Sequence, residues 1–78
     1  MGRFGSSGHV TNRIRKLRFE AGEMTQQELA ELVGVSRQTV VAIEGDKYAP
    51  SLEVAFRIAE VFDLPLDAVF SYERREQS

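Results

Sequence analysis

Three polar side chains that can form directed hydrogen bonds follow one another in the stretch SRQT, residues 36 to 39. The guanidinium of Arg37 can donate two parallel hydrogen bonds to guanine, and the amide of Gln38 can pair in the same way with adenine. The hydroxyl of Thr39 can reach a base or a phosphate. These side chains therefore have the chemistry needed to read base edges in a major groove.

The charge of Arg37 is also unexpected for a helix start. Ser36 is a typical helix N-cap, and the dipole of the helix that follows favours Asp or Glu in the first turn. A solvent-exposed helix face with only a structural role is expected to carry Glu and Lys, which favour helices. We therefore interpret Arg37, Gln38 and Thr39 as residues that contact a partner.

Two short helices and a tight turn must position these side chains. The stretch TQQE, residues 25 to 28, has the pattern of a capping box, which marks a helix start. Gly34 tolerates the positive φ of a turn, and Ala30 is small enough for the helices to cross closely. With a second helix over residues 37 to 44, the pattern is that of a helix-turn-helix. The alternative, a purely structural helical hairpin, is disfavoured by the polar first turn.

Apolar spacing predicts three further helices. Positions 10, 14, 17 and 21 share one helical face, so the first helix is expected to run from Val10 to about Gly22. Ser51 caps a fourth helix and Pro65 opens a fifth. The aromatic side chains at helical spacing are assigned to the core: Phe56, Phe62 and Phe70. Because we find no strand pattern and no repeat, we predict an all-α fold of five short helices.

The 78 residues are enough for one domain with a modest core. We place this domain at residues 10 to 71. Residues 1 to 9, MGRFGSSGH, contain too little apolar surface to order and are expected to be either a natural flexible segment or a remnant of expression. Residues 72 to 78 are expected to be a polar tail. His9, the sole histidine, lies at the end of this flexible segment.

Composition excludes several classes of function. The chain has no cysteine, so it can form no disulfide and no thiolate metal site. We expect no metal, no cofactor and no enzymatic activity, because no nucleophile has a base beside it. No apolar run reaches the roughly 18 residues of a membrane span, so a cytoplasmic protein is expected.

The net charge of −2 does not by itself favour a polyanionic partner. The charges are unevenly distributed, however. Residues 10 to 18 contain four basic residues and no acid, whereas residues 53 to 67 contain four acids and one arginine. The basic run either faces a polyanion or is simply a solvated helix face.

Residues 12 to 70 resemble the Cro and phage-repressor-like (XRE) family of helix-turn-helix regulators, in particular its short stand-alone members. The resemblance rests on SRQT at the start of the third helix and on the continuation KY.PSLE.AF.IA. It implies a compact five-helix, lambda-repressor-like DNA-binding domain with the helix-turn-helix at helices two and three. It also implies a double-stranded DNA operator as partner and a homodimer.

The resemblance assigns roles to individual residues. Gln26 matches a position that binds phosphate and braces the recognition helix, and Lys47 matches a phosphate contact in the following loop. Ser36, Arg37 and Gln38 match positions that meet the groove, and Thr39 one near the backbone. Arg18 and Glu44 match a structural pair that joins helix one to the end of helix three.

Three departures from the family pattern concern this interface. Gly45-Asp46 replaces the common Asn-Gly, which adds an acid near the expected phosphate path. Glu23 is an additional residue before helix two, and Ala42 stands where many relatives have a longer polar side chain. We predict a sequence-specific transcriptional regulator, most simply a repressor. The alternatives are a protein-interaction adaptor with this fold and an antitoxin that binds both DNA and a toxin.

Overall fold

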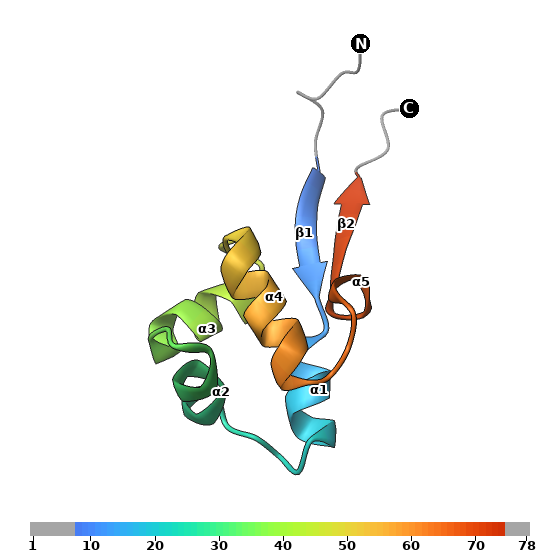
Figure 1. Ribbon diagram of the computed structural model, residues 1–78. Coiled ribbons are helices and arrows are strands. Elements are labelled where there is room, and N and C mark those ends of the chain that lie inside the picture. The colour runs from blue at the N-terminus through green and yellow to red at the C-terminus, as the bar shows by residue number, and fades with distance from the viewer. Residues whose placement is uncertain (1–7, 75–78) are drawn as a thin grey trace.

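The computed structural model describes residues 8 to 74, which form five helices and a two-stranded sheet (Figure 1). In chain order the elements are β1 (Gly8–Asn12), α1 (Ile14–Glu20), α2 (Gln26–Val33), α3 (Arg37–Glu44), α4 (Leu52–Val61), α5 (Leu66–Val69) and β2 (Phe70–Arg74). The helices form a compact body, and the two strands project from it as a ribbon. All five predicted helices are therefore present.

Three helices begin at the hydroxyl residues that the sequence predicts as caps. Thr25 and Glu28 form a complete capping box at the start of α2, in which the Thr25 side chain accepts from the Glu28 backbone N–H. Ser36 and Ser51 accept in the same way at α3 and α4. Gly34 ends α2 with φ 89°, in the left-handed region that suits glycine. Local chemistry therefore sets the boundaries of the helix-turn-helix.

The hydrophobic core lies where α1, α2, α3 and α4 meet. Its fully buried side chains come from every helix: Ile14, Leu29, Val33, Val40, Ile43, Ile58 and Val69. Val40 and Ile43 hold the inner face of α3 against this core, so the opposite face remains in solvent. Phe56 was predicted to lie in the core, and that prediction is wrong, because its side chain is 54% exposed. Phe62 is half-buried and Phe70 is buried, as expected.

The structure contains a two-stranded sheet, so the prediction of an all-α fold without strands is wrong. β1 and β2 pair antiparallel, with Gly8 opposite Arg74, Val10 opposite Tyr72 and Asn12 opposite Phe70. Val10 therefore belongs to β1, and α1 begins only at Ile14. Alternation of Phe70 and Tyr72 with polar neighbours is a short period-two signal for β2. The pattern at Val10 fits a helix as well as a strand, so it could not identify β1.

Part of the expected flexible segment and part of the expected polar tail form the ribbon. Residues 8 and 9 of the first belong to β1, and residues 72 to 74 of the second belong to β2. Residues 1 to 7 and 75 to 78, the remainder of these two segments, lie outside the described residues.

Asn12 joins the sheet to two helices. Its Nδ2 donates to the Ile43 carbonyl at 2.8 Å and to Asp46 Oδ1 at 3.2 Å. Its Oδ1 accepts from the Ile14 backbone N–H at 3.0 Å, at the start of α1. One side chain therefore fixes the end of β1 to α1 and to the end of α3.

Replacing Asn12 with Ala removes all three hydrogen bonds, and the half-buried Ile43 carbonyl and Ile14 N–H lose these partners. We expect Asn12→Ala to lower the free energy of unfolding by about 1–3 kcal/mol. Urea denaturation measures this change. Ser71→Ala, at an exposed ribbon position, is the control and should stay within about 0.5 kcal/mol of the parent. Equal values for the two variants would show that Asn12 does not join these elements.

Candidate nucleic-acid interface

The first turn of α3 presents Arg37 and Gln38 to solvent. Both residues are exposed, and their side chains form no hydrogen bond or ion pair within residues 8 to 74. Because Val40 and Ile43 are buried, α3 cannot rotate to hide these side chains without opening the core. The fold therefore holds two hydrogen-bonding side chains at one helix end with their polar groups available.

Ser36 and Thr39 are occupied by capping. Ser36 Oγ accepts from the Thr39 backbone N–H at 3.1 Å, and the two hydroxyl oxygens lie 2.9 Å apart. Thr39 is half-buried and Ser36 is exposed. These hydroxyls set where the helix begins, and each keeps hydrogen-bonding capacity for a further partner.

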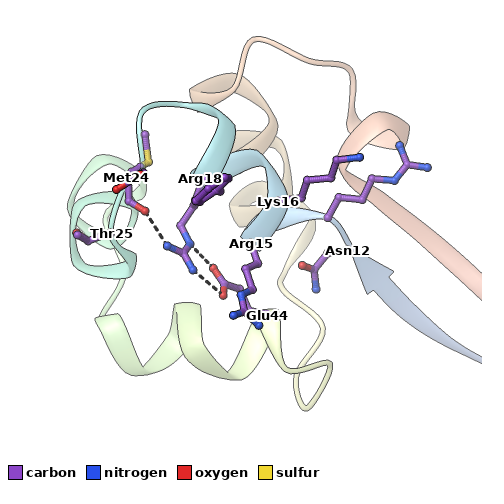
Figure 2. A pocket seen from close by; sticks show the side chains of 10 residues that line it. Asn12, Arg15, Lys16, Arg18, Met24, Thr25 and Glu44 are labelled. Atoms are coloured by element: carbon purple, nitrogen blue, oxygen red, sulfur yellow. Dashed lines mark hydrogen bonds and ion pairs between the residues drawn. The ribbon is translucent and has the colours of Figure 1, made fainter.

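A partly buried ion pair fixes the other end of α3. Arg18 Nε lies 2.5 Å from Glu44 Oε2, and Arg18 also donates to Glu44 Oε1 at 3.1 Å. The two side chains are only 14% and 9% exposed. The third bond of the guanidinium, to the Met24 carbonyl at 2.6 Å, ties the loop before α2 to the same pair (Figure 2).

Gln26 is brought into this network from α2. Its Nε2 donates to Glu44 Oε1 at 3.2 Å, so one carboxylate accepts from α1 and from the first residue of α2. Three of the residues singled out in the sequence, Arg18, Gln26 and Glu44, thus lie in contact. The roles assigned to Gln26 and Glu44 stay predictions; the hydrogen bonds show that α1, α2 and the end of α3 meet at this carboxylate.

Lys47 lies in the exposed loop that follows α3, where its backbone N–H donates to the Ala42 carbonyl. Asp46 beside it adopts φ 59°, a conformation that is unfavourable for a residue with a side chain. The bond from Asn12 holds the Asp46 carboxylate toward β1. The additional acid of the Gly45-Asp46 sequence therefore has a hydrogen-bond partner in Asn12.

The basic residues of the N-terminal half of the domain line a groove of about 760 Å³ beside this network. Its basic wall consists of Arg13, Arg15, Lys16 and Arg18, and the groove extends to Met24, Thr25 and Glu44. Figure 2 shows Arg15 and Lys16 on α1 and Arg18 turned toward Glu44. Arg13, Arg15 and Lys16 are exposed, so their charge is accessible next to the start of α2.

The described residues show neither a metal cluster nor a membrane-spanning helix. Within residues 8 to 74, no three His, Asp or Glu side chains are grouped as metal ligands would be. None of the helices in this region has the length and apolarity needed to cross a membrane. The features that do stand out, a braced α3 with an exposed polar first turn, are those of a DNA-binding helix-turn-helix.

Comparison with known families agrees with this assignment. A helix-turn-helix family model matches residues 14 to 69. The chain belongs to the Cro/C1-type (XRE) helix-turn-helix family of DNA-binding transcriptional regulators. Proteins of this class act by binding double-stranded DNA and are not enzymes.

Several relatives are uncharacterized HTH-type transcriptional regulators. One from Methanocaldococcus jannaschii is 51% identical over 53 residues, which cover 68% of this chain and 80% of the relative. One from Archaeoglobus fulgidus is 47% identical over 67 residues, which cover 86% of this chain and 94% of the relative. One from Bacillus subtilis is 44% identical over 64 residues, which cover 82% of this chain and 96% of the relative. The similarity therefore covers 80% to 96% of the length of these relatives.

Solved structures share the fold. A crystal structure from Bacteroides fragilis superposes with a TM-score of 0.70 at 27% identity and covers 80% of this chain and 98% of that one. The transcriptional regulator VanUg superposes with a TM-score of 0.74 at 22% identity and covers 96% and 99%. The second similarity is one of fold alone.

The Arg18–Glu44 pair should be strongly coupled. Because either partner left alone is a partly buried, unpaired charge, Arg18→Ala and Glu44→Ala should each lower the free energy of unfolding by about 3 kcal/mol. The double variant should lose less than the sum, with a coupling energy of about 0.5–3 kcal/mol. Thermal or urea unfolding of the four proteins gives this value.

The chain offers a matched control for this cycle. Arg57 and Glu53 form an exposed i,i+4 pair at 2.8 Å on α4. Solvent screens such a pair, so its coupling energy should be only about 0.3–0.5 kcal/mol. Equal coupling in the two cycles would show that burial does not strengthen the Arg18–Glu44 pair.

Arg37 should reduce the stability of α3. Arg37→Glu removes a cation from the positive end of the helix dipole and adds an anion there, so it should raise the free energy of unfolding by about 0.3–1 kcal/mol. Arg37→Gln, which removes the cation only, should have a smaller effect. Thermal unfolding at low salt measures both. A clear loss of stability in Arg37→Glu would mean that Arg37 has a structural partner.

Proposed function

We propose that this protein is a homodimeric repressor that reads a palindromic operator through the major groove. The observation that carries the proposal is the exposed first turn of α3. There Arg37 and Gln38 are held by a buried helix face and have no side-chain hydrogen bond within residues 8 to 74. Side chains of these types discriminate guanine and adenine when a recognition helix enters the groove.

Within this proposal, the interface residues divide into two groups. Arg37 and Gln38 contact base edges and supply specificity. Gln26 and Lys47 contact phosphates on the two sides of α3, and the hydroxyls of Ser36 and Thr39 contact the backbone or a base at the groove. Gln26 keeps one amide hydrogen to donate to a phosphate oxygen while its other amide hydrogen is donated to Glu44.

The exposed basic residues of α1 extend the phosphate contacts. Arg13, Arg15 and Lys16 line the groove that ends at Thr25, next to Gln26. A DNA strand that passes Gln26 would lie within reach of these long side chains. The proposal thus uses the basic run as backbone contact, and it explains how a chain of net charge −2 binds a polyanion.

Dimerisation follows from the small size of one recognition helix. The polar first turn of α3 offers only a few base contacts, which are too few to specify an operator. Two copies related by a two-fold axis would read two half-sites, and the operator would then be palindromic. Occupation of such a site blocks transcription directly, and for this reason we propose repression rather than activation.

Selection of bound sequences from a random double-stranded DNA pool tests the function. We expect enrichment of a palindrome whose half-sites lie about one helical turn apart. Enrichment of a single, non-repeated site would overturn the dimer part of the proposal. No enrichment above the input pool would overturn DNA reading and favour the adaptor function.

Variants then test the division between base and phosphate contacts. Arg37→Ala should weaken binding to the selected duplex by about 1–3 kcal/mol and change binding to random DNA much less. Lys47→Ala should weaken binding to both duplexes by similar factors and reduce the salt dependence by about one phosphate contact. Fluorescence anisotropy titrations at several salt concentrations measure these effects. Equal losses on both duplexes for Arg37→Ala would make Arg37 a backbone contact.

A further inference from the structure

One exposed aromatic ring on α1 has no role in the core or in the proposed DNA contacts. Phe19 is 68% exposed, although an aromatic side chain gains much stability when it packs. It lies about one helical turn after Arg15 and Lys16, on the outer face of α1. The bases of a double helix are stacked on one another, so a duplex that passes α1 offers no base face to this ring. Contact with duplex DNA therefore does not explain why Phe19 is exposed.

Three cations line the same groove as Phe19. The groove has a volume of about 760 Å³, which lies within the range of small-molecule sites. Its cations are Arg13, Arg15 and Lys16, referred to below as the α1 cations. All three are exposed and form no ion pair within residues 8 to 74. The groove thus combines an accessible aromatic ring with accessible positive charge.

The two acids that line the groove do not cancel this charge. Glu44 is neutralised by Arg18, which donates two hydrogen bonds to its carboxylate (Figure 2). Glu23 follows Phe19 in the chain, and its backbone N–H donates to the Phe19 carbonyl at 3.0 Å. Its carboxylate therefore belongs to the part of the chain that follows the ring. The groove is positive toward Arg13 and aromatic toward Phe19.

The order of these side chains along α1 suits a ligand that is aromatic at one end and anionic at the other. Lys16 lies three residues before Phe19 and Arg13 lies six residues before it, about 4.5 and 9 Å along a helix axis. Arg15, four residues before the ring, adds a third cation near the same face. A nucleoside polyphosphate has this form, because its base is joined through a sugar to a row of phosphates.

We propose that this groove binds a nucleoside polyphosphate, whose base stacks on Phe19 and whose phosphates lie against the α1 cations. Proteins hold unpaired bases by stacking them on aromatic rings, and arginine binds phosphate through charge-assisted hydrogen bonds. Met24 also lines the groove and supplies a further apolar contact. The site thus assigns a role to the exposed ring that duplex DNA leaves unexplained.

A bound nucleotide would compete with the operator. Under the proposed function the α1 cations also contact phosphates of the duplex, and this part of the inference rests on that function. The same cations cannot bind both polyanions at once, so the nucleotide would lower the affinity of the chain for DNA. The protein would then release its operator when the nucleotide is abundant.

Isothermal titration calorimetry of the full chain with ATP tests the site. Inorganic triphosphate and adenosine, the two halves of this probe, are titrated in parallel. The parent should bind ATP more tightly than either half. Phe19→Ala should weaken ATP binding by about tenfold or more and leave triphosphate binding unchanged. Phe19→Tyr keeps an aromatic ring and should bind ATP as the parent does.

Phe56→Ala is the matched control for the loss of an exposed ring. Phe56 is 54% exposed, but it lies on α4 and does not line this groove. Its variant should bind ATP with the affinity of the parent. Lys16→Ala should weaken the binding of both ATP and triphosphate, because a phosphate contact is lost. Urea denaturation checks that each variant is folded.

Fluorescence anisotropy on the selected duplex measures the competition. At equal concentration, ATP should lower the affinity of the parent for the duplex more than triphosphate does, because the base adds to nucleotide binding. Phe19→Ala should bind the duplex as the parent does, since the ring makes no contact with DNA. In this variant ATP should have no greater effect than triphosphate.

The possible failures are distinguishable. Equal binding of ATP and triphosphate by the parent, or equal binding of ATP by the parent and Phe19→Ala, would reject the nucleotide site and leave operator selection intact. ATP that binds without weakening the duplex would reject the competition. Failure of operator selection together with ATP binding that depends on Phe19 would reject the proposed function and support the nucleotide site.

Discussion

The orientation of α3 depends on one partly buried carboxylate. Glu44 accepts hydrogen bonds from Arg18 of α1 and Gln26 of α2, and Arg18 also holds the Met24 carbonyl before α2. Three segments that would otherwise be linked mainly by apolar contacts therefore acquire directional constraints at one point. Apolar packing tolerates small rotations of a helix, whereas a bidentate guanidinium–carboxylate pair does not. The direction in which α3 presents its exposed side chains is therefore fixed more narrowly than apolar packing alone would fix it.

The two ends of α3 have different tasks. Its C-terminal end is tied to Arg18, Gln26 and, through the Ile43 carbonyl, to Asn12. Its N-terminal end carries Arg37 against the preference of the helix dipole, and no acid lies in that first turn. Stabilising contacts are thus concentrated where the helix is anchored, and the dipole interaction is unfavourable at its exposed first turn. Such a division is expected where selection for function opposes local stability.

Sequence reasoning succeeded where the controlling interactions are local. The hydroxyl caps at Thr25, Ser36 and Ser51 and the left-handed Gly34 depend on neighbours within four residues, so the helix-turn-helix and the exposure of Arg37 could be predicted. The ribbon could not be predicted, because Val10 is a strand residue only by pairing with Tyr72, which lies far along the chain. Phe56 has helical spacing with the core residues, but spacing alone does not show that α4 turns this ring to solvent. The Asn12–Asp46 bond likewise depends on the completed fold.

The pairing of Gly8 with Arg74 also determines the order in which the molecule can be completed. During synthesis β1 leaves the ribosome before every helix, and β2 follows all of them. The contacts between α2 and α3 close a short loop, whereas the ribbon closes nearly the whole described chain and carries a larger loop-closure entropy. The contacts between α2 and α3 can therefore form before β1 has met its partner strand. Loop closure makes the ribbon the entropically most costly pairing of the fold.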